Sequence, residues 1–218
     1  MLAALLLLCS PLLPAQTPAL PPDRHFRVLL GDREVGDHHF RFSREGEAIA
    51  VHSEAGFRVK LAFVTVYRYD HDARERWRDG CLVGLESTTD DNGTDYRVEA
   101  AWHDGVLSVS GTRDSRSVRT QCPWTFAYWN PDLREREELF NAQTGERLEV
   151  EVRPLGPRTL QLAGAERTFP AWKLDAEGMD LVVYYDSDGR WMGIDSTLEN
   201  GRVLRYRPAQ DDPAWPSP

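Results

Sequence analysis

The sequence predicts a mainly β protein, in which a curved antiparallel sheet forms a half-open or closed barrel with one helix packed against it. Two observations support this fold class. Dipeptides that suit tight hairpin turns recur as Asp79-Gly80, Asn92-Gly93, Asp104-Gly105, Asp188-Gly189 and Asn200-Gly201. Between these turns, apolar and polar residues alternate, which is typical of antiparallel strands with one solvated face.

The first residues indicate export. Residues 1–15 form an apolar run that closes on Ala15, which predicts a cleaved signal peptide and a periplasmic or secreted protein. No Lys or Arg precedes Arg24, so the usual basic start is missing and the true start site stays open. Cys9 offers a lipid-anchor alternative, although a small residue does not precede it. The run is shorter than the roughly 20 residues that span a bilayer, so an integral membrane protein is not expected.

The remaining chain fits one domain. We expect a Pro-rich linker over residues 16–22, a single antiparallel β domain over 23–207 and a disordered tail over 208–218. The longest alternating segment is FRVKLAFVTVYRY, and it predicts one long strand from Phe57 to Tyr69.

One segment departs from the strand pattern. Asn130 suits a helix N-cap, and Pro131 suits the first helical position. We therefore predict a helix over about residues 131–140, with Phe140 on its inner side.

Charge and cysteine content limit the partners. The net charge of −9 and the pI near 5.2 argue against nucleic acid, whose phosphates require a basic surface. After signal cleavage, Cys81 and Cys122 remain, and a pair in an oxidising compartment is typical of one disulfide. Two unrelated buried thiols are the alternative. Neither cysteine belongs to a C-x-x-C motif, which argues against a redox or zinc role.

The histidines predict no metal site, and no cofactor is expected. His38 and His39 are adjacent, so on a strand they point to opposite faces and cannot bind one ion. The remaining histidines, apart from His71, are isolated in the sequence: His25, His52 and His103.

Catalytic motifs are also missing from the sequence. It contains no G-x-S-x-G motif and no Gly-rich phosphate loop, so no catalytic residue is assigned and an enzyme is not favoured. If the protein were an enzyme, Asp70, His71 and Asp72 would be the first candidates.

Aromatic residues give the leading hypothesis for a site. They gather around the predicted helix and could line an apolar pocket, which usually carries a few placed polar groups. The alternative is a core built from large side chains. The candidate ligand-binding residues are Trp124, Phe126, Tyr128, Trp129, Phe140 and Trp172.

Several segments resemble an uncharacterised family of exported bacterial proteins, domain of unknown function 6134. They are FRVLLGDREVGDHHF, VYRYDHDARERWRDGCL, TDDNG, CPWTFAYWNP and YYDSDGRWMGIDSTLENGRVLRY. The resemblance implies a periplasmic location and a disulfide between Cys81 and Cys122, and it implies no known activity. The architecture is also distantly similar to the periplasmic lipoprotein-carrier superfamily, whose half-barrels hold lipid.

The leading functional hypothesis is therefore a periplasmic protein that binds or carries a lipid or another apolar ligand. The second hypothesis is a structural or partner-binding envelope protein whose aromatic residues form a closed core. The third is an enzyme of unrecognised type.

Overall fold

The structure is a computed structural model that describes residues 19–162 and 164–213. The predicted signal peptide, with Cys9, lies outside these residues. The first eight strands are β1 (Arg24–Leu30), β2 (Arg33–Glu45), β3 (Ala48–Leu61), β4 (Val64–Arg78), β5 (Cys81–Asp91), β6 (Thr94–His103), β7 (Val106–Gly111) and β8 (Ser115–Arg119). The others are β9 (Glu138–Phe140), β10 (Arg147–Leu162), β11 (Ala165–Ala176), β12 (Met179–Tyr185), β13 (Trp191–Thr197) and β14 (Val203–Pro208).

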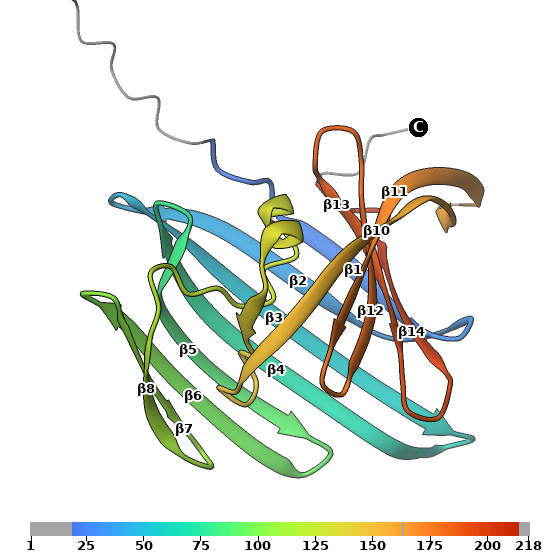
Figure 1. Ribbon diagram of the computed structural model, residues 1–218. Coiled ribbons are helices and arrows are strands. Elements are labelled where there is room, and N and C mark those ends of the chain that lie inside the picture. Colours follow the sequence, from blue (N-terminus) through green and yellow to red (C-terminus); the bar gives the residue numbers. More distant parts are fainter. Residues whose placement is uncertain (1–18, 163, 214–218) are drawn as a thin grey trace, which may run out of the picture.

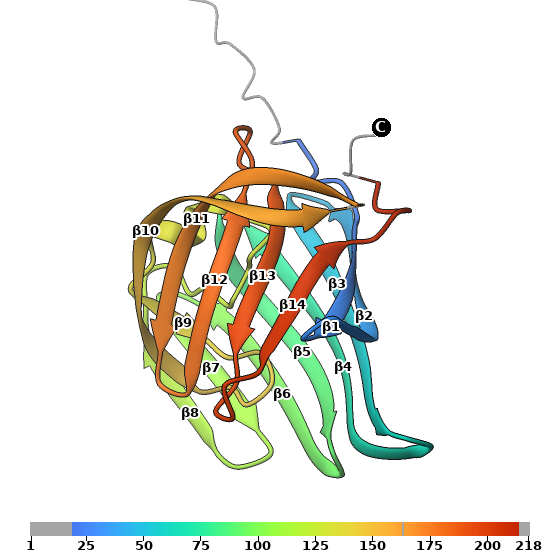
Figure 2. The ribbon, with the colours of Figure 1, turned by 90° about the vertical axis from the view of Figure 1, so that its right-hand side faces the viewer.

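All these strands form one antiparallel sheet in the order β8-β7-β6-β5-β4-β3-β2-β1-β14-β13-β12-β11-β10-β9. The sheet curls so that β2–β7 form one wall and β10–β13 face them (Figures 1 and 2). Within the described residues, β8 and β9 are the two edges and do not pair with each other, so the barrel is not closed. The predicted fold class, a curved antiparallel sheet that resembles a barrel, is confirmed. No helix in the described ranges is long and apolar enough to cross a membrane.

The predicted helix is much shorter than expected. Only Pro131–Glu135 is helical, as a 3₁₀ turn, and the side chain of Asn130 caps it by accepting a hydrogen bond from the Asp132 N–H at 3.0 Å. Arg136 already has an extended backbone, with φ −93° and ψ 140°. Residues 138–140 then pair with β10, and this sheet pairing takes the place of the later helical turns.

The long strand predicted from Phe57 to Tyr69 is two strands. A two-residue turn, Ala62 and Phe63, separates β3 from β4, which then pair with each other. Ala62 adopts the left-handed conformation with φ 54°, which an alanine rarely does. The turn contains none of the residues that usually mark a hairpin, so the sequence pattern did not reveal it.

The chain end is ordered further than predicted. Pro208 pairs with Phe26, and the N–H of Ala209 donates to the carbonyl of His25 at 2.9 Å. Asp212 is also buried, with its carboxylate beside the guanidinium of Arg24. The tail predicted to be disordered from residue 208 is therefore packed through Asp212 by backbone pairing and a buried ion pair.

Candidate ligand-binding interior

The segment between β8 and β9, residues 120–137, crosses the interior and covers one end of the barrel (Figure 1). Its start is fixed by the disulfide between Cys81 and Cys122, whose Cα atoms are 4.9 Å apart. The Leu82 N–H donates to the Pro123 carbonyl at 2.9 Å, which extends the attachment along β5. The expected disulfide is present. We call the covered end, which also holds the β4–β5 and β12–β13 turns, the closed end.

The structure brings the six predicted aromatic residues into one cluster. Trp124 and Phe140 are each only 2 % exposed and belong to the core. The other four are half-buried and pack against that core: Phe126, Tyr128, Trp129 and Trp172.

Trp77 is the centre against which two of these rings pack edge-on. The Trp124 ring lies 5.1 Å away between ring centroids and the Trp129 ring 5.5 Å. Tyr128, on the same segment, lies 5.6 Å from Trp191 on the facing wall. The crossing segment therefore connects both walls through aromatic contacts, while parts of Tyr128 and Trp129 stay accessible.

Two indole groups in this cluster lack a hydrogen-bond partner. The Nε1 atoms of Trp124 and Trp129 are buried and have no acceptor among the described residues. In contrast, Trp102 donates to the Thr120 carbonyl at 2.9 Å, and Trp191 donates to the Gly193 carbonyl at 3.0 Å. A buried donor without a partner is unfavourable, so an acceptor atom from a ligand or a water fits these positions.

Glu75 is a buried acid that the sequence analysis did not single out. Its carboxylate accepts hydrogen bonds from Thr125 Oγ1 at 2.7 Å and from Trp77 Nε1 at 2.8 Å. Burial raises the pKa of Glu75, although these two hydrogen bonds oppose the shift. The acid thereby ties the crossing segment to β4.

A row of inward-facing residues crosses the wall farther from the closed end. His38, Ala55, His71 and Thr89 are register partners on β2, β3, β4 and β5. His71 Nδ1 lies 2.7 Å from Thr89 Oγ1, and His38 Nε2 lies 2.6 Å from Ser53 Oγ. Nδ1 of His38 is buried without a partner among the described atoms.

Both inward-facing histidines are kept neutral. Burial lowers the pKa of His71 to about 4. Burial, with a smaller contribution from His71 nearby, lowers the pKa of His38 well below its usual value. Neutral imidazoles can each donate and accept a hydrogen bond, so they can bind the polar part of a ligand without a charge.

Tyrosine hydroxyls continue this polar region. Tyr67 donates to Asp91 at 2.8 Å, and Tyr69 donates to the Gln143 side chain at 3.1 Å. Burial raises the pKa of Tyr69, Tyr128 and Tyr206. Neighbouring tyrosines add to these shifts: Tyr206 raises the pKa of Tyr69 further, and Tyr128 raises that of Tyr206. These hydroxyls therefore stay protonated and face one interior region shared by both walls and the crossing segment.

Exposure changes along the inward face of β4. Trp77 and Ala73 are each 2 % exposed, whereas His71, Tyr69 and Tyr67 are partly exposed. On β12, Tyr185 is 1 % exposed and Met179 is partly exposed. Solvent therefore reaches these β4 and β12 side chains at the end opposite the crossing segment, where the β3–β4 and β11–β12 turns lie. We call this the open end. Val28, Leu30 and Phe57 at the same end are buried.

The structure separates the residues considered for catalysis. His71 stacks beside Tyr69 on the inward face, whereas Asp70 and Asp72 face outward, because neighbouring residues on a strand alternate between faces. Asp70 pairs with Arg58 at 2.8 Å, and Asp72 lies 2.8 Å from His52 Nε2. The three residues therefore do not form one catalytic group.

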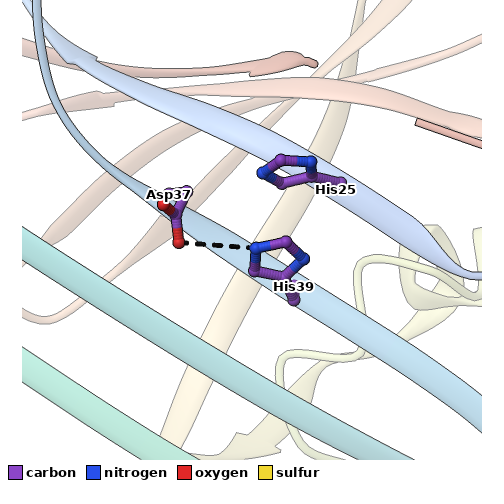
Figure 3. Close-up of side chains that lie close together, drawn as sticks. All are labelled: His25, Asp37 and His39. Carbon is purple, nitrogen blue, oxygen red and sulfur yellow. Dashed lines mark ion pairs between the residues drawn. The ribbon is translucent and has the colours of Figure 1, made fainter. Parts of the chain in front are cut away.

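The outer face carries a charged hollow of about 790 Å³ over β2–β6. His39 lies on its border and stacks on His25, with ring centroids 3.9 Å apart and an angle of 17° between the planes. Figure 3 shows these two rings on neighbouring strands, with Asp37 beside His39 at an Nε2–Oδ1 distance of 3.5 Å. Burial, followed by the neighbouring His25, lowers the pKa of His39.

His25, Asp37 and His39 have the donor types that a transition metal such as zinc prefers. The lone pair of an imidazole nitrogen lies in the ring plane, so two stacked rings do not direct their nitrogens at one point. His25 Nδ1 is also 2.6 Å from the carboxylate of Asp211. One ring would have to rotate and leave its carboxylate before both could bind an ion.

A second outer group consists of His52, Glu54 and Asp72, in which His52 is held by Asp72. His25 and His52 are isolated in the sequence, but strand register places each beside other polar groups. His25 pairs with His39 across the β1–β2 hairpin. The prediction that His38 and His39 face opposite sides is confirmed by their surroundings.

Comparisons with known proteins agree with the architecture. The chain is similar to a beta-barrel-like protein of domain of unknown function DUF1849 from Brucella abortus, at 10 % identity and a TM-score of 0.63. The match covers 90 % of this chain and 99 % of that one, and it shows the fold alone. A search of curated proteins found no match. The profile of the family described as Domain of unknown function (DUF6134) matches residues 26–209, so the chain belongs to this family.

Proposed function

We propose that the protein binds a lipid or another apolar ligand with a polar head inside the barrel, as a carrier in the periplasm. The ligand would lie between Tyr128 and Trp129 of the crossing segment and the inner wall at His38, Tyr69 and Tyr206. One observation carries the proposal: the buried Nε1 of Trp129 and Nδ1 of His38 have no partner among the described residues. Aromatic walls with a few placed polar groups are typical of such sites.

The test is native mass spectrometry with solvent extraction, on protein purified from the envelope of its own host. We expect a stoichiometric lipid or isoprenoid to co-purify. The variant Trp129→Phe keeps an aromatic ring and removes the unpartnered donor, so ligand retention should fall. Trp102→Phe is the matched control, because Trp102 is also half-buried and already donates to Thr120.

An empty protein at the disulfide-bonded mass would contradict the carrier function. It would favour the second candidate, a partner-binding envelope protein, for which the core position of Trp124 and Phe140 is the supporting observation. Equal retention by the Trp129→Phe and Trp102→Phe variants would place the ligand elsewhere.

A further inference from the structure

The β3–β4 hairpin extends past its neighbours in the sheet. β3 pairs with β2 only as far as Phe57, and β4 pairs with β5 only from Tyr69 onward. Residues 58–67 therefore form a two-stranded ribbon whose strands pair only with each other, and Arg68 at its base accepts a backbone hydrogen bond from the Asn92 N–H at 2.8 Å. Figures 1 and 2 show this hairpin projecting at the lower right of the ribbon diagram.

The end of this ribbon is apolar and exposed. Phe63 is 101 % exposed, Val64 65 % and Val66 50 %. The other large exposed apolar side chains in the described ranges, Leu20 at 40 % and Leu198 at 36 %, occur singly. Three such residues within four positions at a projecting tip indicate an interaction surface, since contact with water is unfavourable for each.

Turn chemistry at the tip also differs from that of the neighbouring hairpins. Asp79, Asn92 and Asp104 occupy the left-handed first position of a two-residue turn, and each is followed by glycine. The β3–β4 turn places Ala62 at the same position, with φ 54°, followed by Phe63. Alanine is disfavoured in this conformation, so the fold gains nothing locally from Ala-Phe over Asn-Gly. An interaction of the turn with another molecule would account for Ala-Phe at this position.

The ribbon itself is positively charged, although the whole chain carries −9. No acidic residue occurs between Glu54 and Asp70. At the base of the ribbon, Arg58 pairs with Asp70 and Arg68 with Asp90. Closer to the tip, the Arg33 guanidinium donates to the Lys60 carbonyl at 2.6 Å, so Arg33 lies against the strand that carries Lys60.

We propose that this ribbon docks the protein on a bilayer that contains anionic lipid. Phe63, Val64 and Val66 would enter the headgroup–acyl boundary, and Lys60 and Arg33 would contact lipid phosphates. The ribbon lies at the open end of the barrel, so docking would bring the partly exposed inner residues of β4 towards the membrane surface. The inference goes beyond the carrier function and does not depend on it, because docking needs no ligand in the barrel.

The experiment is co-sedimentation of the purified mature protein with phosphatidylcholine vesicles, with and without one quarter phosphatidylglycerol. The main variant combines Ala62→Asn with Phe63→Gly, which gives this turn the chemistry of Asn92-Gly93. Because Asn-Gly suits the turn, the variant should fold at least as stably as the parent. Leu20→Ser is the control, since Leu20 precedes β1 at the end away from the ribbon.

We expect the parent to bind the anionic vesicles, and more weakly at high salt because ions screen the contact. The Asn-Gly variant should bind about tenfold more weakly, which corresponds to burial of one large apolar side chain, and Leu20→Ser should bind like the parent. Equal binding by the parent and the Asn-Gly variant would overturn the proposal. A parent dimer that the Asn-Gly variant converts to a monomer, without vesicle binding, would instead make the tip a contact between copies. Ligand retention in native mass spectrometry is read separately, so the two proposals can fail independently.

Discussion

Nε of Arg24 lies 3.1 Å from a carboxylate oxygen of Asp212, although 188 positions separate the two residues in the chain. Arg24 is 4 % exposed and so is Asp212. The same carboxylate accepts the His25 N–H at 2.8 Å. The first strand and the last described residues are therefore joined by a buried ion pair. Burial lowers the pKa of Arg24, and Asp212 opposes this shift.

Asp212→Asn should lower the free energy of unfolding by about 3 kcal/mol, because it leaves a buried guanidinium without its counter-charge. Urea denaturation measures this loss. Asp211→Asn is the control, because Asp211 is exposed, and its midpoint should change little. A midpoint for Asp212→Asn equal to that of the parent would mean that the chain end does not contribute to the folded state.

His71→Gln should make the protein less sensitive to acid. The folded pKa of His71 is about 4 and its ordinary value is 6.5. Between these values the unfolded chain takes up a proton that the folded chain does not, so stability is complete above pH 6.5 and decreases as the pH falls towards 4. The decrease is at most about 1.4 kcal/mol per pH unit.

Urea denaturation of the parent and of His71→Gln at pH 7 and pH 5 checks this prediction. The variant should gain up to about 2 kcal/mol relative to the parent at the lower pH. The difference between the two proteins cancels other titrating groups, including Glu75. His103→Gln, at an exposed position, should follow the parent. If the free energy of unfolding changed equally with pH in the parent and in His71→Gln, then His71 would be accessible to protons in the folded state.

Replacing both Cys81 and Cys122 with Ser should lower the free energy of unfolding by about 4 kcal/mol, since the bond closes a loop with a sequence separation of 41. Denaturant midpoints, determined with and without reductant, measure this loss of stability. Reductant should destabilise the parent and leave the double variant unchanged. If the double variant unfolds at the parent's midpoint, then the crossing segment is held by its aromatic packing alone.

Zinc should not stabilise the folded protein through the outer histidine cluster. His25 and His39 stack, and His25 is already bound to Asp211, so ion binding would first have to break both contacts. We expect the melting temperature to be the same with zinc and with a chelator. A zinc-dependent rise that His39→Gln removes would mean that the rings reorient readily, and the cluster would then be a metal site.

The sequence predicted the sheet well because side-chain alternation and turn dipeptides are local signals. Asn92-Gly93 and Asp104-Gly105 are turns in the structure, and the residues between them form β6. Ala62-Phe63 is not a turn dipeptide of this kind, so the sequence predicted one strand where the structure has two. Asn130 and Pro131 correctly marked a helix start, but they could not reveal that β10 pairs with the next residues.

Only part of the candidate site could be predicted from the sequence. An aromatic cluster around residues 124–129 could be predicted from composition, and the structure gathers it with Trp172. The polar row that contains His38 and His71 depends on strand register across three strand pairs, which one sequence does not specify. Whether Trp129 finds an acceptor for its N–H also depends on distant packing.

The two edges of the sheet are held together without strand pairing. The described residues of β8 and β9 share no strand pairing, and the outer side of β9 is instead bridged by Thr125 of the crossing segment. The wall is therefore a scroll whose edges are fastened by loop contacts, such as the hydrogen bond that Ser87 Oγ on β5 donates to the Ala142 carbonyl after β9 at 2.5 Å. Separating the edges would break these contacts but no ladder of the sheet, and the bond between Cys81 and Cys122 would still hold the crossing segment to β5.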